Sequence, residues 1–188
     1  MGHAIFIEDA AETKNIIDGN LVVSTKRSWS LLNTDQTPAS FWITHPDNVV
    51  RNNHAAGSDR YGFWYDTQVN SLGPSFSLNI CPENDKLGEF RDNVTHSNGR
   101  YGLRIFHNLI PREFPCQPLV YDNSDPSQAG HPYPSNPVIP AIFYNLTSFK
   151  NNRNGAIAER VGAVEWHNFK TADNKLAGME FSIVDGSI

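Results

Sequence analysis

Residues 50–65 read VRNNHAAGSDRYGFWY, and this order of residue types returns three more times along the chain. Each copy has an apolar residue and an asparagine, and then a glycine that leads into an apolar run. The distance from asparagine to glycine is nine positions in the first two copies and ten in the last two. The repeated asparagines are Asn53, Asn93, Asn145 and Asn168, and the repeated glycines are Gly62, Gly102, Gly155 and Gly178. A degenerate earlier copy begins at Ile16. Such a period indicates a solenoid whose copies stack on one another.

The spacing between copies predicts the kind of solenoid. Asn145 and Asn168 are 23 residues apart, which is one β-helix rung, whereas the two earlier intervals are 40 and 52 residues. The excess lies in two stretches that contain proline and glycine, about residues 66–87 and 107–138. Both begin at the same point of the repeat, so as insertions they should emerge from one edge. We therefore predict an all-β chain: a right-handed parallel β-helix spanning residues 1–188 as a single segment, with two long inserted loops.

The composition agrees with strands and turns. The chain has 20 Asn, 13 Gly and 12 Pro among 188 residues, and these residue types favour turns over helix interiors. The net charge is −5 and no run of lysine and arginine occurs, so we expect no nucleic-acid partner. No apolar stretch is long enough to cross a bilayer and no signal peptide opens the chain, so we expect no direct membrane insertion.

The two cysteines fall one in each inserted loop. Cys81 lies in the first loop and Cys116 in the second, and these loops leave neighbouring rungs about 4.8 Å apart. A Cys81–Cys116 disulfide is the favoured interpretation, and two buried free thiols are the alternative. A structural disulfide indicates an oxidising compartment.

The repeated asparagines and glycines have predicted structural roles. Asparagine accepts a left-handed backbone at a rung corner, and stacked amides can form an internal hydrogen-bonded ladder. The repeated glycines are expected at tight bends. Asn93 and Asn145 also begin glycosylation sequons, Asn93-Val94-Thr95 and Asn145-Leu146-Thr147. A ladder that points inward excludes a glycan, which is the interpretation we favour, whereas an exposed corner permits one.

Candidate sites for chemistry are few. His3, Glu8 and Asp9 could ligate a divalent cation, but we favour the interpretation that Glu8 and Asp9 end a strand and bind turn amides. We otherwise expect no cofactor. Trp42 and Trp64 could stack on sugar rings, although strand alternation places only half of such residues outside and favours a core position for Phe63 and Tyr65.

Catalytic residues remain unknown at this level. Arg51, Arg91 and Arg104 could each supply the base of a polysaccharide lyase, but no carboxylate cluster accompanies them in the sequence. His54 and His96 are expected to stack at a rung edge, as solvated corner residues rather than as metal ligands.

Several stretches resemble one family. They are residues 2–9 (GHAIFIED), 30–42 (SLLNTDQTPASFW), 55–58 (AAGS), 62–65 (GFWY) and 87–90 (LGEF). These are similar to the β-helix region of fibrocystin-like and cell-migration-inducing hyaluronan-binding proteins. The resemblance implies a parallel β-helix within a large extracellular or cell-surface protein, in which a small β-rich domain and further rungs are separate parts. The ends of the chain are then expected to pack against other rungs or subunits.

Two functions follow as hypotheses. The first is a structural or adhesive cell-surface or ciliary-surface module that assembles end to end into a fibre and is not an enzyme. The second is a depolymerase of a polysaccharide such as hyaluronan, or a non-catalytic glycan-binding module. A carboxylate and a base on one exposed face would favour the second hypothesis.

Overall fold

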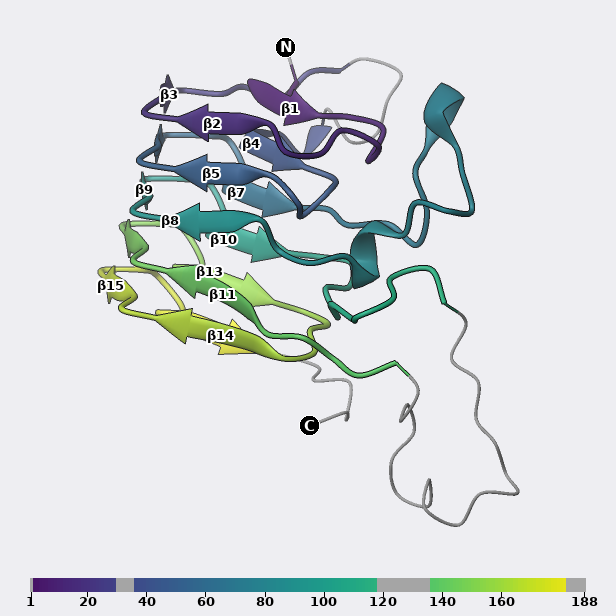
Figure 1. The fold of residues 1–188 in the computed structure, drawn as a ribbon. Coiled ribbons are helices and arrows are strands. Elements are labelled where there is room, and N and C mark those ends of the chain that lie inside the picture. The colour runs from purple at the N-terminus through teal and green to yellow at the C-terminus, as the bar shows by residue number, and fades with distance from the viewer. Residues whose placement is uncertain (1, 30–35, 118–135, 182–188) are drawn as a thin grey trace.

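The computed structural model of the chain describes residues 2–29, 36–117 and 136–181, and its regular secondary structure consists almost entirely of short parallel strands. The strands form three sheets that extend along one axis (Figure 1). Sheet A contains β1 (Ile5–Ile7), β4 (Ala39–Ile43), β7 (Tyr61–Tyr65), β10 (Tyr101–Ile105), β13 (Ala156–Ala158) and β16 (Met179–Phe181). Sheet B contains β2 (Ile16–Asp18), β5 (Val49–Arg51), β8 (Glu89–Arg91), β11 (Ala141–Tyr144) and β14 (Val164–His167). Sheet C contains β3 (Leu21–Val23), β6 (His54–Ala56), β9 (Val94–His96), β12 (Thr147–Phe149) and β15 (Lys170–Ala172).

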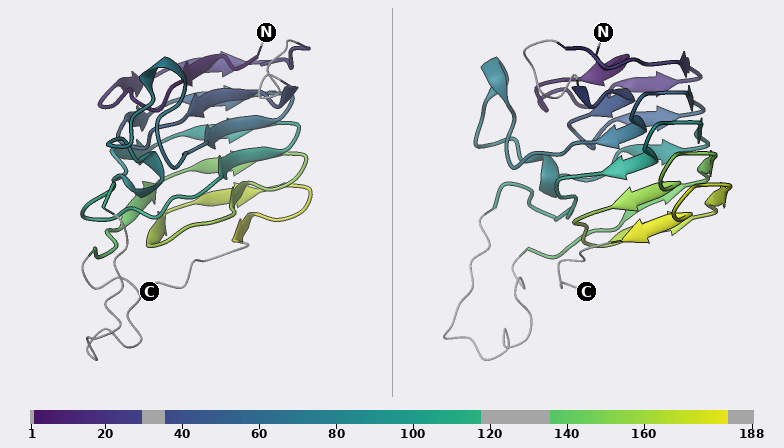
Figure 2. Two further views of the ribbon diagram at one scale, coloured as in Figure 1. Left: turned by 90° about the vertical axis from the view of Figure 1, so that its right-hand side faces the viewer. Right: turned by 180° about the vertical axis from the view of Figure 1, so that it is seen from behind.

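Each rung contributes one strand to each sheet, and equivalent residues of successive rungs lie in register. Phe41 pairs with Phe63, and Phe63 pairs with Leu103. Figure 2 shows the rungs stacked in chain order, from purple at the N-terminus to yellow at the C-terminus. The predicted parallel β-helix is therefore confirmed.

The core is built from rows of side chains that point into the solenoid. Phe41 and Phe63 of sheet A are fully buried, and their ring centroids are 4.7 Å apart. Phe90 and Phe143 of sheet B face them and are also buried. Sheet C contributes the small residues Ala55, Thr95 and Ser148 to the interior. The aromatic side chains of sheets A and B thus fill the interior space next to the small residues of sheet C.

The repeated glycines do not make left-handed bends. None of Gly62, Gly102, Gly155 and Gly178 has a positive φ. Instead, a Cβ at Gly62 would overlap the hydroxyl of Thr95, and a Cβ at Gly102 would overlap that of Ser148. Gly62 and Gly102 lie inside β7 and β10, so the predicted tight bend was wrong for these two, whereas Gly155 and Gly178 form bends directly before β13 and β16, as predicted. Gly62, Gly102 and Gly178 require glycine because hydroxyl groups of sheet C approach their backbone closely.

The predicted asparagine ladder needs a correction of one position. The internal ladder contains Asn20, Asn53 and Asn93, in which the backbone N–H of Asn53 donates to Oδ1 of Asn93 at 3.0 Å. Asn145 and Asn168 instead continue a row of left-handed corner residues, with φ of 50° and 54°. This row also contains Gly19, Asn52 and Asp92. Leu146 takes the internal position in its rung and is fully buried.

A second asparagine ladder lies at the next corner, between sheets C and A. Oδ1 of Asn98 accepts the backbone N–H of Ser58 at 3.1 Å, and Oδ1 of Asn151 accepts that of Asn98 at 3.2 Å. Asn174 continues the row. Sequence reasoning missed this ladder, although Asn98 and Asn151 each stand five residues after an internal position of the first ladder, Asn93 and Leu146.

Removing a ladder amide should be costly. In Asn93→Ala, the N–H of Asn53 and the carbonyl of Val50 lose their partner in a buried corner. We expect the free energy of unfolding to fall by about 1–3 kcal/mol. The matched control, Asn152→Ala, removes the same group from an exposed site and should change it by less than about 0.5 kcal/mol. Urea unfolding of both variants makes the comparison, and equal losses would contradict the ladder's role.

Two long loops leave the solenoid on the same side (Figure 1). The first joins β7 to β8 and contains the 3-10 turns η2 (Gly73–Ser75) and η3 (Pro82–Asn84). The second joins β10 to β11, and its residues 118–135 lie outside the described ranges. The first loop follows Tyr65 and ends before Glu89, and the second follows Ile105 and ends before Ala141. Among the described residues no helix is both long and apolar enough to cross a membrane.

Candidate functional site

The outer face of sheet A carries a second cluster of large side chains. In register, Trp42 of β4 pairs with Trp64 of β7, and Trp64 pairs with Arg104 of β10. Tyr61 and Tyr101 stack beside this row with ring centroids 5.7 Å apart. Aromatic rings therefore cover the outside of the sheet as well as its inside.

The two tryptophans differ in exposure. Trp64 points outward but is only 5% exposed, so the prediction that Trp64 contacts glycan was wrong. The guanidinium of Arg104 lies 5.3 Å from the Trp64 ring and helps to cover it. Trp42 is half-buried, and its other neighbour is His3, which stacks on it at 4.3 Å. Only Trp42 of this pair can offer part of its ring to a ligand.

Asp66 forms the polar end of this face. It follows β7 directly and is 4% exposed, yet its Oδ2 accepts a hydrogen bond from Nε1 of Trp42 at 3.1 Å. Its Oδ1 lies 3.3 Å from Nδ1 of His107, whose side chain is half exposed. Burial raises the pKa of Asp66, and the hydrogen bond from Trp42 and the charge of His107 oppose that shift. Asp66 is therefore a buried carboxyl that reaches solvent through an imidazole.

Arg104 binds a second carboxylate on the same face. Its Nη2 is 3.0 Å from Oε1 of Glu159, and its Nη1 donates to the hydroxyl of Tyr61 at 3.0 Å. The guanidinium also lies 4.3 Å from the ring of Phe106. These contacts hold Arg104 in position. Arg104 in turn fixes the aromatic side chains of this face and adds positive charge near Asp66.

A carboxylate-and-base constellation, which the sequence did not reveal, is thus present on one face. Asp66, Phe106 and Glu159 each stand four residues after a repeated glycine, and they come from three successive rungs. A carboxylate at the same repeat position in two rungs is the signal that could have found them. Buried Asp66 with exposed His107 can hold and exchange a proton, and Trp42 beside them can stack on a sugar ring.

The inserted loops position this site, because Asp66 opens the first and His107 the second. Between the loops, the N–H of Ile110 donates to the carbonyl of Glu83 at 2.7 Å, and Nδ2 of Asn84 donates to the carbonyl of Ile110 at 2.9 Å. The hydroxyl of Thr67 donates to the carbonyl of Asn108. The loops therefore form one body next to the end of sheet A.

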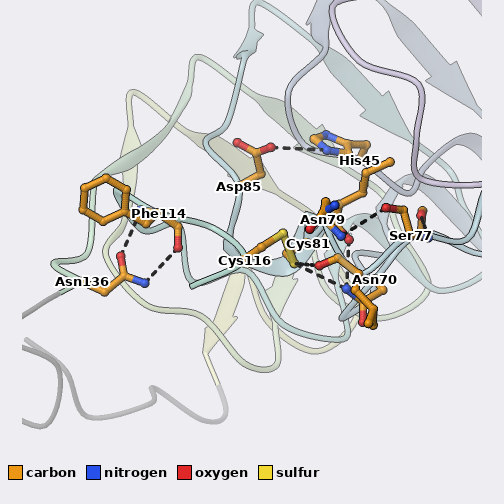
Figure 3. Close-up of a disulfide and its surroundings, with 12 residues drawn as sticks. His45, Asn70, Ser77, Asn79, Cys81, Asp85, Phe114, Cys116 and Asn136 are labelled. Atoms are coloured by element: carbon orange, nitrogen blue, oxygen red, sulfur yellow. Dashed lines mark hydrogen bonds and ion pairs between the residues drawn. A yellow bond between two sulfur atoms is a disulfide. The ribbon is translucent and has the colours of Figure 1, made fainter. Parts of the chain in front are cut away.

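A disulfide ties the two loops together, as predicted. Cys81 and Cys116 are bonded, with their Cα atoms 5.3 Å apart. Figure 3 shows Asn70 beside Cys81, where its Nδ2 lies 3.4 Å from the sulfur. On the other side, Asn136 and Phe114 exchange two hydrogen bonds that close the described part of the second loop.

The other predicted candidates do not form a site. The structure shows no group of three or more His, Cys, Asp or Glu side chains arranged for a metal ion in residues 2–29, 36–117 and 136–181, so the predicted cluster of His3, Glu8 and Asp9 was wrong. Nδ1 of His3 accepts the N–H of Ala39, and Asp9 accepts a hydrogen bond from Ser75. His54 and His96 do meet, with ring centroids 5.0 Å apart. Arg51 and Arg91 lie on sheet B, away from the aromatic face.

Comparison with known proteins decides the family. The model of the CEMIP β-helix family matches residues 1–103. The chain belongs to this family. Mouse fibrocystin-L is 43% identical over 95% of this chain, and human fibrocystin-L is 41% identical over the same share. Human cell surface hyaluronidase CEMIP2 is 35% identical over the whole chain.

The chain spans only a small part of these relatives. It covers 4% of the length of the fibrocystin-L proteins and 16% of CEMIP2. The relatives of this CEMIP β-helix segment are extracellular or cell-surface proteins, which confirms the predicted location. The family resemblance seen in the sequence is confirmed as well.

The raised pKa of Asp66 predicts how the stability of the chain depends on pH. A group whose pKa is raised by folding contributes stability that is fully present below its unfolded pKa and is lost as pH rises through its folded pKa. We expect Asp66→Asn to gain stability relative to the parent chain as pH rises from about 4 to about 7. Urea unfolding across this range measures the trend.

Asp59 provides a control of opposite sign. A hydrogen bond from the backbone of Arg27 lowers its pKa, so its contribution is present above the unfolded pKa and lost as pH falls. Asp59→Asn should therefore lose stability relative to the parent as pH rises. Trends of the same sign in both variants would contradict the buried environment of Asp66.

The two sequons of this CEMIP β-helix segment have different environments. Asn93 is fully buried and its Nδ2 donates to the carbonyl of Val50, whereas Asn145 is a half-buried corner residue. A glycan on Asn93 would prevent the ladder from closing. We expect N-glycosidase treatment and peptide mass analysis of protein from a glycosylating host to find a glycan on Asn145 alone. A glycan on Asn93 of folded protein would contradict this placement.

Proposed function

We propose that this chain is an extracellular β-helix segment that binds a polysaccharide across the outer face of sheet A. The observation that carries the proposal is the placement of half-buried Trp42 against Asp66, with His107 exposed beside them. Indole faces stack on sugar rings, and an imidazole and a carboxylate bond sugar hydroxyls. The flat row of parallel strands allows an extended chain to lie across several rungs.

Hyaluronan is the first ligand to test. Relatives of this chain include a cell surface hyaluronidase and a cell migration-inducing and hyaluronan-binding protein, and these names support the choice. Calorimetry with hyaluronan oligosaccharides should give binding that His107→Ala weakens by about tenfold, or about 1.4 kcal/mol.

The matched control is His167→Ala. His167 on β14 is equally exposed and also pairs with a carboxylate, Glu165, but it lies on sheet B. It should leave the affinity unchanged. Equal weakening by both variants, or no binding by the parent chain, would refute the proposed site.

Cleavage of the polysaccharide is the second candidate function. It is favoured by one observation: Asp66 is a buried carboxyl with a raised pKa, next to an imidazole that reaches solvent. Such a pair can take a proton from a water molecule that attacks the sugar carbon and give a proton to the oxygen that leaves, so that the glycosidic bond is hydrolysed. The length of hyaluronan should then fall with time in the presence of the parent chain and not with His107→Ala. We propose that no cofactor is needed, so calcium should not alter the rate.

We also propose that further rungs or subunits pack end to end against this segment. Strands β1, β2 and β3 each pair on one side only, and Ile16, Leu21 and Val23 of this rung are more than half exposed. Unpaired strand edges with apolar side chains are surfaces for strand addition. Light scattering and electron microscopy of the chain should reveal linear assemblies at high concentration. A strict monomer with Ile16, Leu21 and Val23 open to solvent would contradict the fibre.

A further inference from the structure

A column of arginines runs along the corner between sheets C and A. Arg60, Arg100 and Arg153 occupy equivalent positions in successive rungs, since the N–H of Arg100 donates to the carbonyl of Arg60 at 2.8 Å and that of Arg153 to the carbonyl of Arg100 at 2.9 Å. Asp59 accepts the backbone N–H of Arg27 at 3.0 Å, which places Arg27 in the rung before Arg60. We call Arg27, Arg60, Arg100 and Arg153 the basic column.

The charges of the basic column are close and poorly balanced. The pKa of Arg60 is lowered by burial first, and then by the charges of Arg100, Arg27 and Arg153. Nε of Arg60 is buried without a hydrogen-bond partner. Arg100 and Arg153 form no ion pair with any described residue, and the one carboxylate that pairs with this corner is Asp59. In a chain of net charge −5, this corner is a concentrated positive field.

The geometry fits a linear anion that runs along the solenoid axis. Successive rungs are about 4.8 Å apart, so the column places one arginine for each rung at the same corner. Guanidinium groups bind oxyanions through two parallel N–H donors. Lys26 and Lys175 lie at the flanking position of the same corner and extend the field.

We propose that the basic column binds a sulfated polysaccharide chain. The extracellular location of the relatives favours a polysaccharide over a nucleic acid. We favour sulfated chains over hyaluronan because the arginines of successive rungs are more closely spaced than the carboxylates of hyaluronan. Hyaluronan carries a carboxylate only on every second sugar. The proposal does not depend on the proposed function, because the column precedes the strands of sheet A, whereas Asp66 and His107 follow them, about 17 Å away across a five-residue strand.

Binding of size-matched heparin and hyaluronan oligosaccharides at several salt concentrations tests the proposal. We expect heparin to bind the full chain, and the variant Arg100→Ser/Arg153→Ser to bind it roughly tenfold more weakly with a shallower salt dependence. The matched control, Arg51→Ser/Arg91→Ser, removes the same charge from sheet B and should stay within about twofold. Arg153→Ser alone, at an exposed site, gives an intermediate loss if the double variant fails to fold.

The outcomes separate the two sites. His107→Ala should leave heparin binding intact, and the column variants should leave hyaluronan binding intact. The proposal is overturned if heparin does not bind, or if the control weakens binding as much as the column variant does. It is equally overturned if the column variants weaken hyaluronan binding and spare heparin binding.

Discussion

Replacing Phe63 by alanine lowers the free energy of unfolding by about 3–5 kcal/mol. Phe63 is fully buried at the centre of sheet A, where it stacks on Phe41 and meets the edge of Phe90 at 5.6 Å. The substitution leaves a cavity between rows whose positions are fixed by strand pairing, so neighbouring rungs cannot close it. Urea unfolding followed by tryptophan fluorescence measures the loss.

Phe76→Ala is the control for this prediction. Phe76 lies in the first loop and is 63% exposed, so its removal should change the free energy of unfolding by less than about 0.5 kcal/mol. If Phe63→Ala cost no more than Phe76→Ala, the continuous aromatic core would be wrong.

Removing the Cys81–Cys116 disulfide has the second largest expected effect. The bond closes a separation of 35 residues, and loss of that constraint from the unfolded chain costs about 3–4 kcal/mol. The variant Cys81→Ser/Cys116→Ser should therefore unfold at lower urea, and the parent chain with a reductant should match it. Hyaluronan affinity should fall as well, because the tied loops hold Asp66 against His107.

Treatment with a reductant separates the loss of the disulfide from any destabilisation caused by the serine substitutions themselves. It should have no effect on the stability of the serine variant, which has no other cysteine to lose. A variant as stable as the parent would mean that the loop-to-loop hydrogen bonds alone hold the two insertions.

The fold could be predicted from the sequence because each rung of the solenoid repeats the same order of residue types. The glycines and apolar runs recur in each rung, and the two long intervals located both loops and their cysteines. The ladder was misplaced because asparagines were matched by identity. Asn52, Asp92, Asn145 and Asn168 all stand ten residues before a repeated glycine, and this constant distance marks the true register. Asn53 and Asn93 are therefore one position further on.

The candidate site could not be predicted in the same way. Asp66 and Glu159 belong to rungs separated by both insertions, so their place near Arg104 depends on strand register rather than on a motif. The difference in exposure between Trp42 and Trp64 could not be predicted from strand alternation either, because both side chains point outward. What buries Trp64 is the guanidinium of Arg104 and the carbonyl of Phe106, which accepts its Nε1–H.

The most direct test of polysaccharide binding by the outer face of sheet A is a nuclear magnetic resonance titration of the full chain with hyaluronan oligosaccharides. Binding at the outer face of sheet A should give saturable shifts of the indole N–H of Trp42 and the imidazole of His107. Trp29 and His167, which are exposed elsewhere, should not move. Shifts confined to Trp29 or His167, or none at saturating ligand, would show that the outer face of sheet A is not a polysaccharide site.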